Sequence, residues 1–306
     1  MIVLDGKAFH HLLAVVRAGS IRGAAGELGI APSAVSRHIA DLEHRLGITL
    51  LERTPRGVAL TEAGRLAVEH ARRFFEDQEV LTEQLDQLKG LSRGVVRLCC
   101  GEGFVADLID NGLKCFSRDY PTIRVRIALA GTRGVMEAIS RGDTDIGIAY
   151  NPVIDENIQS LAITRQPLSA VVPPDHPLAQ RRGVRLRELL DEPLALLSEG
   201  HGIRHLVGRA AADCGKALTP VLETTSMDVL RRFVRAGKGI TFLPRFVVAT
   251  ELAEGSLGLV ELADPLLAEA TTHLIVRAHR RLPDSVARMA DCLIGEMDAF
   301  QDRNGG

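Results

Sequence analysis

The chain has 306 residues, of which 46% are hydrophobic and 25% are charged, so it can bury a substantial core and is expected to form two or three domains. Charged residues recur so often that no stretch approaches the roughly twenty apolar residues of a membrane-spanning helix. Near the amino terminus an acid, Asp5, stands where a signal peptide has its basic region, so we expect a cytoplasmic protein. The five cysteines include no C-x-x-C pair, and neither a metal site nor a cofactor is expected.

The net charge of -2 is distributed unevenly along the chain. Residues 1–66 contain eight Lys and Arg against six Asp and Glu, which leaves a net charge of -4 for the remainder. This mild asymmetry is compatible with a small DNA-binding head on a neutral-to-acidic body, although ordinary surface variation gives a similar bias.

The first 50 residues predict three short helices. Apolar residues recur at helical spacing over Phe9–Val16, and Ser20 can cap a second helix that runs to Leu28. Pro32 suits the first position of a third helix, which Gly47 closes. Two helices joined by a tight turn form a helix-turn-helix, whose second helix can lie in the major groove of DNA.

The segment after these helices predicts a wing, because residues 49–60 form two short apolar stretches around a basic turn that contains Arg53 and Arg56. We expect Ser36 and Arg37 on the third helix to face the major groove, and the two wing arginines to contact phosphates. The alternative is that these arginines pair with nearby acids, namely Asp41, Glu43 and Glu52. The candidate DNA-binding residues are Ser20, Pro32, Ser33, Ser36, Arg37, His38, Arg53 and Arg56.

From Thr61 to Leu88 the chain contains no proline, and its apolar residues alternate by four and three positions. This is a heptad seam with one polar member, and its residues are Ala67, Ala71, Phe74, Gln78, Leu81, Leu85 and Leu88. The seam predicts a long dimerising helix, and the alternative is an amphipathic helix packed on its own domain. Residues 89–94 supply a hinge or linker.

Beyond Gly94 the pattern alternates between strands and helices, which predicts an α/β fold. Strands are expected at 95–100, 123–129, 145–149, 168–172, 194–197, 220–223, 240–243 and 271–276. Helices are expected at 104–116, 133–140, 203–214, 226–236 and 283–300. About 200 residues suit two small α/β lobes with a ligand cleft between them.

Several segments of the chain resemble the LysR-type transcriptional regulators. In the first 64 residues the resemblance is highly specific, and it continues more loosely to the end of the chain. The segments that carry it near the amino terminus are 19–25 (GSIRGAA), 34–39 (AVSRHI), 50–53 (LLER) and 60–64 (LTEAG). Those that carry it farther on are 142–148 (GDTDIGI), 175–179 (DHPLA) and 236–244 (AGKGITFLP).

The resemblance implies a winged helix-turn-helix at residues 1–60, a linker and dimerisation helix at 61–90, and an effector-binding domain at 91–306. That domain would resemble periplasmic binding proteins, with lobe I at about 91–165 and 268–306 and lobe II at about 166–267. It also implies a homodimer or a dimer-of-dimers tetramer on a pseudo-palindromic duplex DNA site, a small-molecule effector, and RNA polymerase as a candidate partner. No catalysis and no membrane contact are implied.

Two positions of the third helix depart from the family pattern. Pro32 stands where the family often has glutamine, and Ala31 stands where it often has a capping serine. Because proline cannot read a base edge by hydrogen bonding, specificity is expected to depend more on Ser33, Ser36, Arg37 and the wing.

Three further patterns allow other interpretations. Residues 101–106 fit G-x-G-x-x-A between a strand and a helix, as in a dinucleotide site, but the next strand ends without an acid for the ribose. His201 and His205 are four apart, but Gly202 replaces the glutamate of a zinc protease motif. Peroxide-sensing relatives carry a reactive cysteine in a Gly-His-Cys-Leu-Arg segment, whereas residues 200–204 read Gly-His-Gly-Ile-Arg.

The remaining cysteines offer no clear replacement for the reactive thiol of the peroxide-sensing relatives. Cys99 and Cys100 fall in a predicted core strand, where buried thiols are usually inert, and Cys214 is isolated.

The alternative function is an α/β enzyme or a solute-binding protein with an accessory helical head. The missing catalytic constellation counts against an enzyme, and the missing signal peptide counts against a periplasmic binder.

The effector is expected beyond the carboxyl ends of the strands, where helix amino termini present N–H groups to an anion. Hydroxyl and basic side chains gather in those segments, which favours a small carboxylate. The candidate effector-binding residues are Gly101, Glu102, Gly103, Phe104, Thr132, Arg133, His201, Arg204, Thr225 and Ser226.

Glu102 complicates this expectation, because an acid at the mouth of the pocket repels a simple anion but can hold an amino group. It favours a metabolite that carries both a carboxylate and an amine, such as an amino acid. The alternative is that Glu102 points to solvent or pairs with Arg133, which leaves a plain carboxylate as the ligand.

Overall fold

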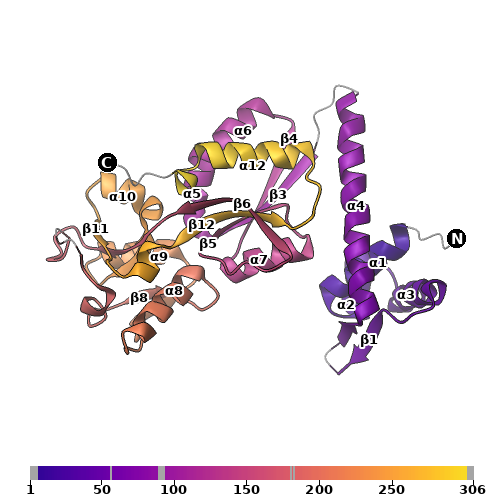
Figure 1. Ribbon diagram of the computed structural model, residues 1–306, viewed down its shortest axis with the longest axis horizontal. Helices are drawn as coiled ribbons and strands as arrows, with labels where there is room; N and C mark the ends of the chain where they lie inside the picture. The colour runs from indigo at the N-terminus through magenta and orange to yellow at the C-terminus, as the bar shows by residue number, and fades with distance from the viewer. Residues whose placement is uncertain (1–5, 56, 89–93, 180, 182, 302–306) are drawn as a thin grey trace. The chain divides into compact units, whose positions relative to one another are not determined.

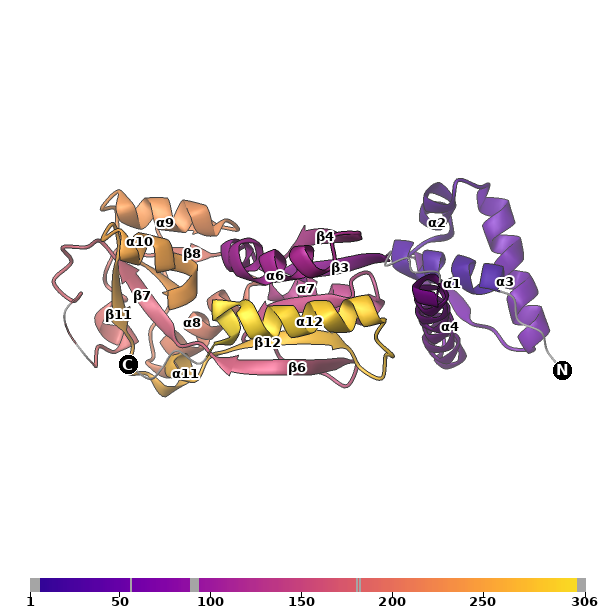
Figure 2. The same ribbon diagram turned by 90° about the horizontal axis from the view of Figure 1, so that it is seen from above.

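The computed structural model describes residues 6–55, 57–88, 94–179, 181 and 183–301 (Figures 1 and 2). The chain divides into two compact units, one made of residues 1–91 with residues 280–283 and the other of the remaining residues. Among the described helices, none has both the length and the apolar character that a membrane crossing requires.

The first unit, here called the head, consists in its described part of helices and one β-hairpin (Figure 1). Its elements are α1 (Gly6–Ala18), α2 (Ile21–Leu28), α3 (Pro32–Leu46), β1 (Leu51–Thr54), β2 (Gly57–Leu60) and α4 (Glu62–Leu88). Ser20 Oγ accepts a hydrogen bond from Gly23 N at 3.0 Å and thereby caps α2, and Pro32 lies in the first turn of α3. Gly29 and Gly47 end α2 and α3 with left-handed φ angles of 65° and 67°.

The core of the head is contributed by every one of its helices and by the residue that precedes the hairpin. Its buried members include Leu12, Val15, Ala24, Val35, Leu42, Leu50 and Val68. Close backbone approaches tie the hairpin to the helices, because Val58 N donates a hydrogen bond to Gly19 O at 3.1 Å and a side chain at Gly57 would collide with the same oxygen. Gly64 lies against the Leu50 carbonyl in the same way, so the wing has a fixed place on the head.

The long helix α4 has two parts with different surroundings. In its first half Ala71 is fully buried, and the ring of Phe74 packs against that of Phe9 with 5.7 Å between centroids. Farther along, the exposed fractions of the seam residues are 55% for Leu81, 47% for Leu85 and 84% for Leu88. The other elements of the head therefore bury only the first part of the heptad seam of α4.

The second unit, here called the α/β unit, contains a five-stranded sheet in the order β4-β3-β5-β12-β6. The strands are β3 (Gly94–Cys100), β4 (Ile123–Leu129), β5 (Ile146–Tyr150), β6 (Ile158–Arg165) and β12 (Thr271–Arg277). Strands β4 and β5 run parallel to β3, whereas β12 is antiparallel to both β5 and β6. In Figure 1 the helices α6 (Leu113–Asp119) and α12 (Asp284–Glu296) lie on one side of this sheet and α7 (Thr132–Arg141) lies on the other.

A second lobe of the α/β unit is inserted between β6 and β12. In its three-stranded sheet β7 (Leu168–Val172) lies between β10 (Thr241–Pro244) and β11 (Gly258–Glu261), and both neighbours are antiparallel to it. The parallel pair β8 (Ala195–Leu197) and β9 (Leu222–Thr224) lies beside it. The helices of this lobe are α8 (Gly202–Asp213), α9 (Met227–Arg235), α10 (Ala249–Ala253) and α11 (Pro265–Ala268).

The structure differs from the sequence-based expectation in several places. The short helices α10 and α11 were not expected, and the helix expected over 283–300 ends at Glu296. The helix expected over 104–116 is broken into a 3-10 turn at 102–104, the short helix α5 (Val105–Asp107), a π-helical turn over Leu108–Gly112, and α6. The break accompanies a distant contact, because the Asp107 carboxylate accepts hydrogen bonds from the backbone nitrogens of Asp298 and Ala299 at 2.9 and 2.8 Å. The strands β6 and β11 were not expected, and both take part in sheets.

Candidate functional sites

Helix α3 presents a polar face toward solvent at its amino-terminal end. Pro32, Ser33 and Arg37 are exposed and Ser36 is half-buried, whereas the opposite face, which includes Val35, is buried in the core of the head. Arg37 forms no ion pair with any residue that the structure describes. A guanidinium in this state is available for a base edge or a phosphate.

Two of the three acids near Arg37 have other partners. Asp41 pairs with Arg45 at 2.7 Å, and Glu43 Oε1 accepts hydrogen bonds from the backbone nitrogens of Leu50 and Leu51 at 2.7 and 3.0 Å. Because Arg37 forms no ion pair with Asp41, Glu43 or Glu52, the alternative that it only pairs with these surface acids is wrong.

The side chains of two other candidate DNA-binding residues make contacts within the head. The His38 ring stacks on that of His11 in α1, with 4.2 Å between centroids and 3° between planes, so it packs toward the helix bundle. Ser20 Oγ accepts a hydrogen bond as the cap of α2. In the wing, Arg53 lies opposite Val58 in the hairpin. The side chain of Arg53 and all of Arg56 lie outside the described residues, so their expected phosphate contacts stay a prediction.

In the α/β unit, four candidate effector residues meet around one narrow cavity. The four are Gly101, Phe104, Thr132 and His201. The lining also includes residues that were not predicted from the sequence, such as Tyr150 and Met227. The volume of this cavity is only about 20 Å³. A single water needs about 10–15 Å³, so the expected effector cleft is closed in this structure.

Glu102 is one of the residues that hold this cleft closed. Its carboxylate accepts hydrogen bonds from Ser226 Oγ at 3.0 Å, from Met227 N at 2.8 Å and from Asp228 N at 3.3 Å. These donors lie at the amino terminus of α9, where a carboxylate is favoured by the free N–H groups and by the helix dipole. The alternative that Glu102 points to solvent or pairs with Arg133 is wrong.

A second set of hydrogen bonds joins the same two lobes. Thr132 Oγ1 donates to the Tyr150 carbonyl oxygen at 3.2 Å and accepts from Gly202 N at 2.9 Å. Arg133 N donates to the Gly200 carbonyl oxygen at 3.2 Å, but the Arg133 side chain is 79% exposed. The hydroxyl that was expected to bind an effector is thus already used between the lobes.

Among the remaining candidates, Gly103, Arg204 and Thr225 lie around the cleft without lining its cavity. His201 Nδ1 lies 3.0 Å from the Ser198 carbonyl oxygen, and Thr225 is exposed, whereas Arg204 is half-buried in α8. Gly103 packs against Met227, where a side chain would collide with the thioether sulfur. This packing accounts for the glycine without a bound dinucleotide.

Three thiols of the α/β unit have a pKa that is raised by burial, which keeps them protonated at neutral pH. Burial raises the pKa of Cys100 to about 12 and also raises that of Cys99. Cys115 and Cys292 were not paired by sequence reasoning, yet their sulfur atoms lie 3.6 Å apart. Burial, followed by the hydrogen bond to Cys115, raises the pKa of Cys292 to about 12.

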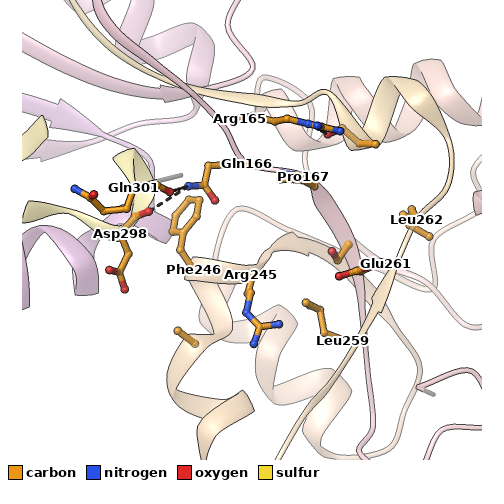
Figure 3. A pocket seen from close by; sticks show the side chains of 13 residues that line it. Arg165, Gln166, Pro167, Arg245, Phe246, Leu259, Glu261, Leu262, Asp298 and Gln301 are labelled. Carbon is orange, nitrogen blue, oxygen red and sulfur yellow. Dashed lines mark hydrogen bonds between the residues drawn. The ribbon is translucent and has the colours of Figure 1, made fainter. Parts of the chain in front are cut away.

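A second and much larger cavity, of about 390 Å³, lies elsewhere in the α/β unit (Figure 3). It lies between the crossover from β6 to β7, the strand β11 and the segment that follows β10. Arg245, Phe246, Leu259 and Glu261 surround the same hollow, and none of them was predicted as a ligand-binding residue. Cavities of about 300–1,000 Å³ are typical of small-molecule sites.

Comparison with known proteins places both units. Residues 7–65 match the family described as "Bacterial regulatory helix-turn-helix protein, lysR family", and residues 89–298 match the "LysR substrate binding domain". The chain is 30% identical over 297 residues to the SDS degradation transcriptional activation protein of a Pseudomonas species, which covers 95% of this chain and 96% of the relative. It is 26% identical over 292 residues to the RuBisCO operon transcriptional regulator of Allochromatium vinosum, with 95% and 96% covered.

Solved structures share the fold over nearly the whole chain. A variant of full-length OxyR from Pseudomonas aeruginosa superposes with a TM-score of 0.71 at 20% identity, covering 97% of this chain and 96% of that one. Full-length BenM superposes with a TM-score of 0.56 at 25% identity, with 95% and 96% covered. The chain therefore belongs to the LysR family of transcriptional regulators, with a helix-turn-helix domain at its amino terminus and a LysR substrate-binding domain after it.

Proposed function

We propose that the protein is a non-enzymatic, cytoplasmic regulator that recognises duplex DNA through α3 and the wing. The observation that carries the proposal is the exposed guanidinium of Arg37 on α3, which forms no ion pair with a described residue. Arg37 and Ser36 read base edges in the major groove, Ser33 supports them, and Arg53 and Arg56 contact phosphates. In this proposal the winged helix-turn-helix spans residues 1–60 and the linker helix spans 61–90.

The exposed part of the heptad seam supports a homodimer as the DNA-binding form. Leu81, Leu85 and Leu88 present an apolar stripe that the head does not cover. Pairing two such stripes places two heads on the half-sites of a pseudo-palindromic site, and two dimers give a tetramer. RNA polymerase is a partner that this arrangement permits.

The effector-binding domain, residues 91–306, takes a small carboxylate at the cleft in this proposal. Glu102 now fills the amino terminus of α9 with its own carboxylate. A ligand carboxylate that binds there replaces Glu102, so binding and separation of the two lobes are coupled. Thr132, His201 and Ser226 are the polar side chains within reach of such a ligand.

The test of DNA recognition is a mobility-shift titration of the purified full chain on a duplex from upstream of its own gene. Arg37→Ala should weaken specific binding by about 1–3 kcal/mol and relax sequence preference. Arg45→Ala is the matched control, since it removes the same charge from the other end of α3, where Arg45 pairs with Asp41. Equal binding by wild type and Arg37→Ala would refute the proposed docking.

A salt titration separates base contacts from phosphate contacts. Arg53→Ala should weaken specific and non-specific duplexes alike and lower the slope of log affinity against log salt by about one. Arg37→Ala should instead reduce the ratio of specific to non-specific affinity. A chain that binds a metabolite but no duplex would favour a solute-binding protein.

A further inference from the structure

The large cavity of about 390 Å³ is built differently from the closed cleft. It opens beside the three-stranded sheet of the second lobe, and its lining combines charged side chains with apolar ones (Figure 3). We propose that this cavity, and not only the cleft, is a binding site for a free amino acid with an apolar side chain. The inference rests on the proposed regulatory function, and it concerns a different set of residues.

Ser169 is the first observation that points to a ligand. It is only 4% exposed, it lines the cavity, and no described residue forms a hydrogen bond with its hydroxyl. In the register of the sheet it lies directly opposite Glu261, so the two side chains share one face of β7 and β11. The Ser169 hydroxyl is therefore available to a donor or acceptor on a ligand in the cavity.

The charges of the cavity supply the second observation. Arg245 and Glu261 both line it, and neither forms an ion pair with the other or with any further residue that the structure describes. By contrast, the neighbouring Arg165 is engaged, because it binds Glu269 at 2.9 Å and the Ala268 carbonyl oxygen at 2.9 Å. Arg245 and Glu261 are thus an exposed cation and an exposed anion beside the same hollow, and neither is paired with a described residue. This arrangement matches a ligand that carries a carboxylate and an ammonium group.

The rest of the lining defines the part of the ligand between its charges. Phe246, Leu259 and Leu262 offer apolar surface next to Arg245 and Glu261. A ligand with an apolar side chain would bury that surface, whereas a highly charged ligand would leave it without a partner. The cavity has room for such a molecule, which the closed cleft does not.

Two contacts connect the cavity with the cleft. The Phe246 ring stacks on the Phe104 ring, with 5.2 Å between centroids and 21° between planes, and Phe104 lines the cleft. Tyr150, which also lines the cleft, donates its hydroxyl hydrogen to the Gln166 carbonyl oxygen at 2.7 Å, and Gln166 lines the cavity. A ligand that moves Phe246 or Gln166 therefore acts on residues that hold the two lobes together.

Titration calorimetry on the full chain tests the site with L-valine, L-leucine and L-phenylalanine as probes. At least one of them should bind and raise the melting temperature. N-acetyl-L-leucine, which lacks the ammonium group, and isopentylamine, which lacks the carboxylate, should bind at least about tenfold more weakly. If no probe binds, or if the truncated compounds bind as well as the amino acid, the proposal is overturned.

Substitutions then locate the binding site. Arg245→Gln and Glu261→Gln should each weaken binding at least about tenfold, and Ser169→Ala should weaken it less while leaving the fold intact, since its hydroxyl holds nothing. Arg187→Gln, an exposed arginine of the same lobe, is the matched control and should bind like wild type. Loss of binding in the cleft variant His201→Gln, with normal binding in the three cavity variants, would contradict the proposal.

The same preparations distinguish this inference from the proposed function. Each variant is also titrated with the upstream duplex, which reports on the head and on folding at once. Duplex binding without amino-acid binding would overturn the cavity site and leave the DNA-binding proposal standing. Amino-acid binding that depends on Arg245, without duplex binding, would support the cavity site and overturn the DNA-binding proposal.

Discussion

The two units of the chain use their polar side chains in opposite ways. In the head, apolar residues build the fold, and Arg37 remains exposed without an ion pair among the described residues. In the α/β unit, residues expected to contact an effector already hold the structure: Glu102 accepts three hydrogen bonds and Thr132 joins Tyr150 to Gly202. An exposed polar face is therefore ready for a partner, whereas a polar residue between two lobes must be displaced before a ligand can use it.

The largest expected effect concerns the head. The double substitution Leu81→Asp and Leu85→Asp places two charges on the exposed part of the heptad seam. Because a charge in an apolar helix interface is costly to bury, we expect sedimentation to show monomers and specific DNA binding to be lost. The fold of the head should survive, since neither residue belongs to its core.

Leu66→Asp provides the control for this prediction. Leu66 is also on α4 and is 72% exposed, but it lies off the seam. The variant should sediment and bind DNA like wild type. A wild-type chain that is monomeric at micromolar concentration would contradict the dimer, and so would an unchanged oligomeric state in the double variant.

The next effect concerns the closed cleft of the α/β unit. Glu102→Ala leaves the backbone nitrogens of Met227 and Asp228 and the Ser226 hydroxyl without their acceptor. Calorimetric unfolding should show that the α/β unit loses about 1–3 kcal/mol of stability. Glu102→Gln keeps one carbonyl oxygen in place and should lose less.

Glu137→Ala is the matched control for Glu102→Ala. Glu137 lies on α7 and pairs with Arg141 at 3.5 Å on the surface, so its removal should change the stability of the unit by no more than about 0.5 kcal/mol. DNA binding by the head should be the same in both variants. Equal stability of Glu102→Ala and wild type would show that the hydrogen bonds at α9 do not hold the lobes.

Local signals explain why the head could be predicted so fully. Ser20 as a cap, Pro32 in a first turn and Gly29 and Gly47 as helix ends each act within a few residues of their position. The sequence could not show that Arg37 forms no ion pair with a described residue. That outcome accompanies the use of Glu43 by Leu50 N and Leu51 N and of Asp41 by Arg45. The stacking of His38 on His11 also depends on how two helices cross, which no local pattern encodes.

In the α/β unit the elements were more predictable than the sites. Most strands and helices follow from apolar runs and turn residues, but β11 is short and begins with a glycine, so its pattern is weak. The partner of Glu102 is Met227, 125 positions later, and Ser169 faces Glu261 only through the pairing of β7 with β11. Because such juxtapositions arise from topology, the larger cavity could not be predicted from the sequence.

The smallest expected effect is a pH dependence of stability that comes from one buried histidine of the α/β unit. His273 is 8% exposed, and its two ring nitrogens lie 2.9 Å from the hydroxyl oxygens of Ser160 and Thr271. Burial lowers the pKa of His273 below its ordinary value of 6.5. At pH values below about 6.5 the unfolded chain therefore binds a proton that the folded chain does not bind.

The sign of the pH dependence follows from that difference. Stability rises with pH wherever the unfolded state holds more protons, so the contribution of His273 is complete above pH 6.5 and is lost as the pH falls toward its folded pKa. Urea unfolding at several pH values should show a smaller loss of stability on acidification in His273→Gln than in wild type. His205→Gln, which removes an exposed histidine of the same unit, is the control. It should lose as much stability as wild type when the pH is lowered. If His273→Gln and wild type lose stability in parallel, His273 is not the polar group that the fold keeps neutral, and the acid sensitivity of the unit resides elsewhere.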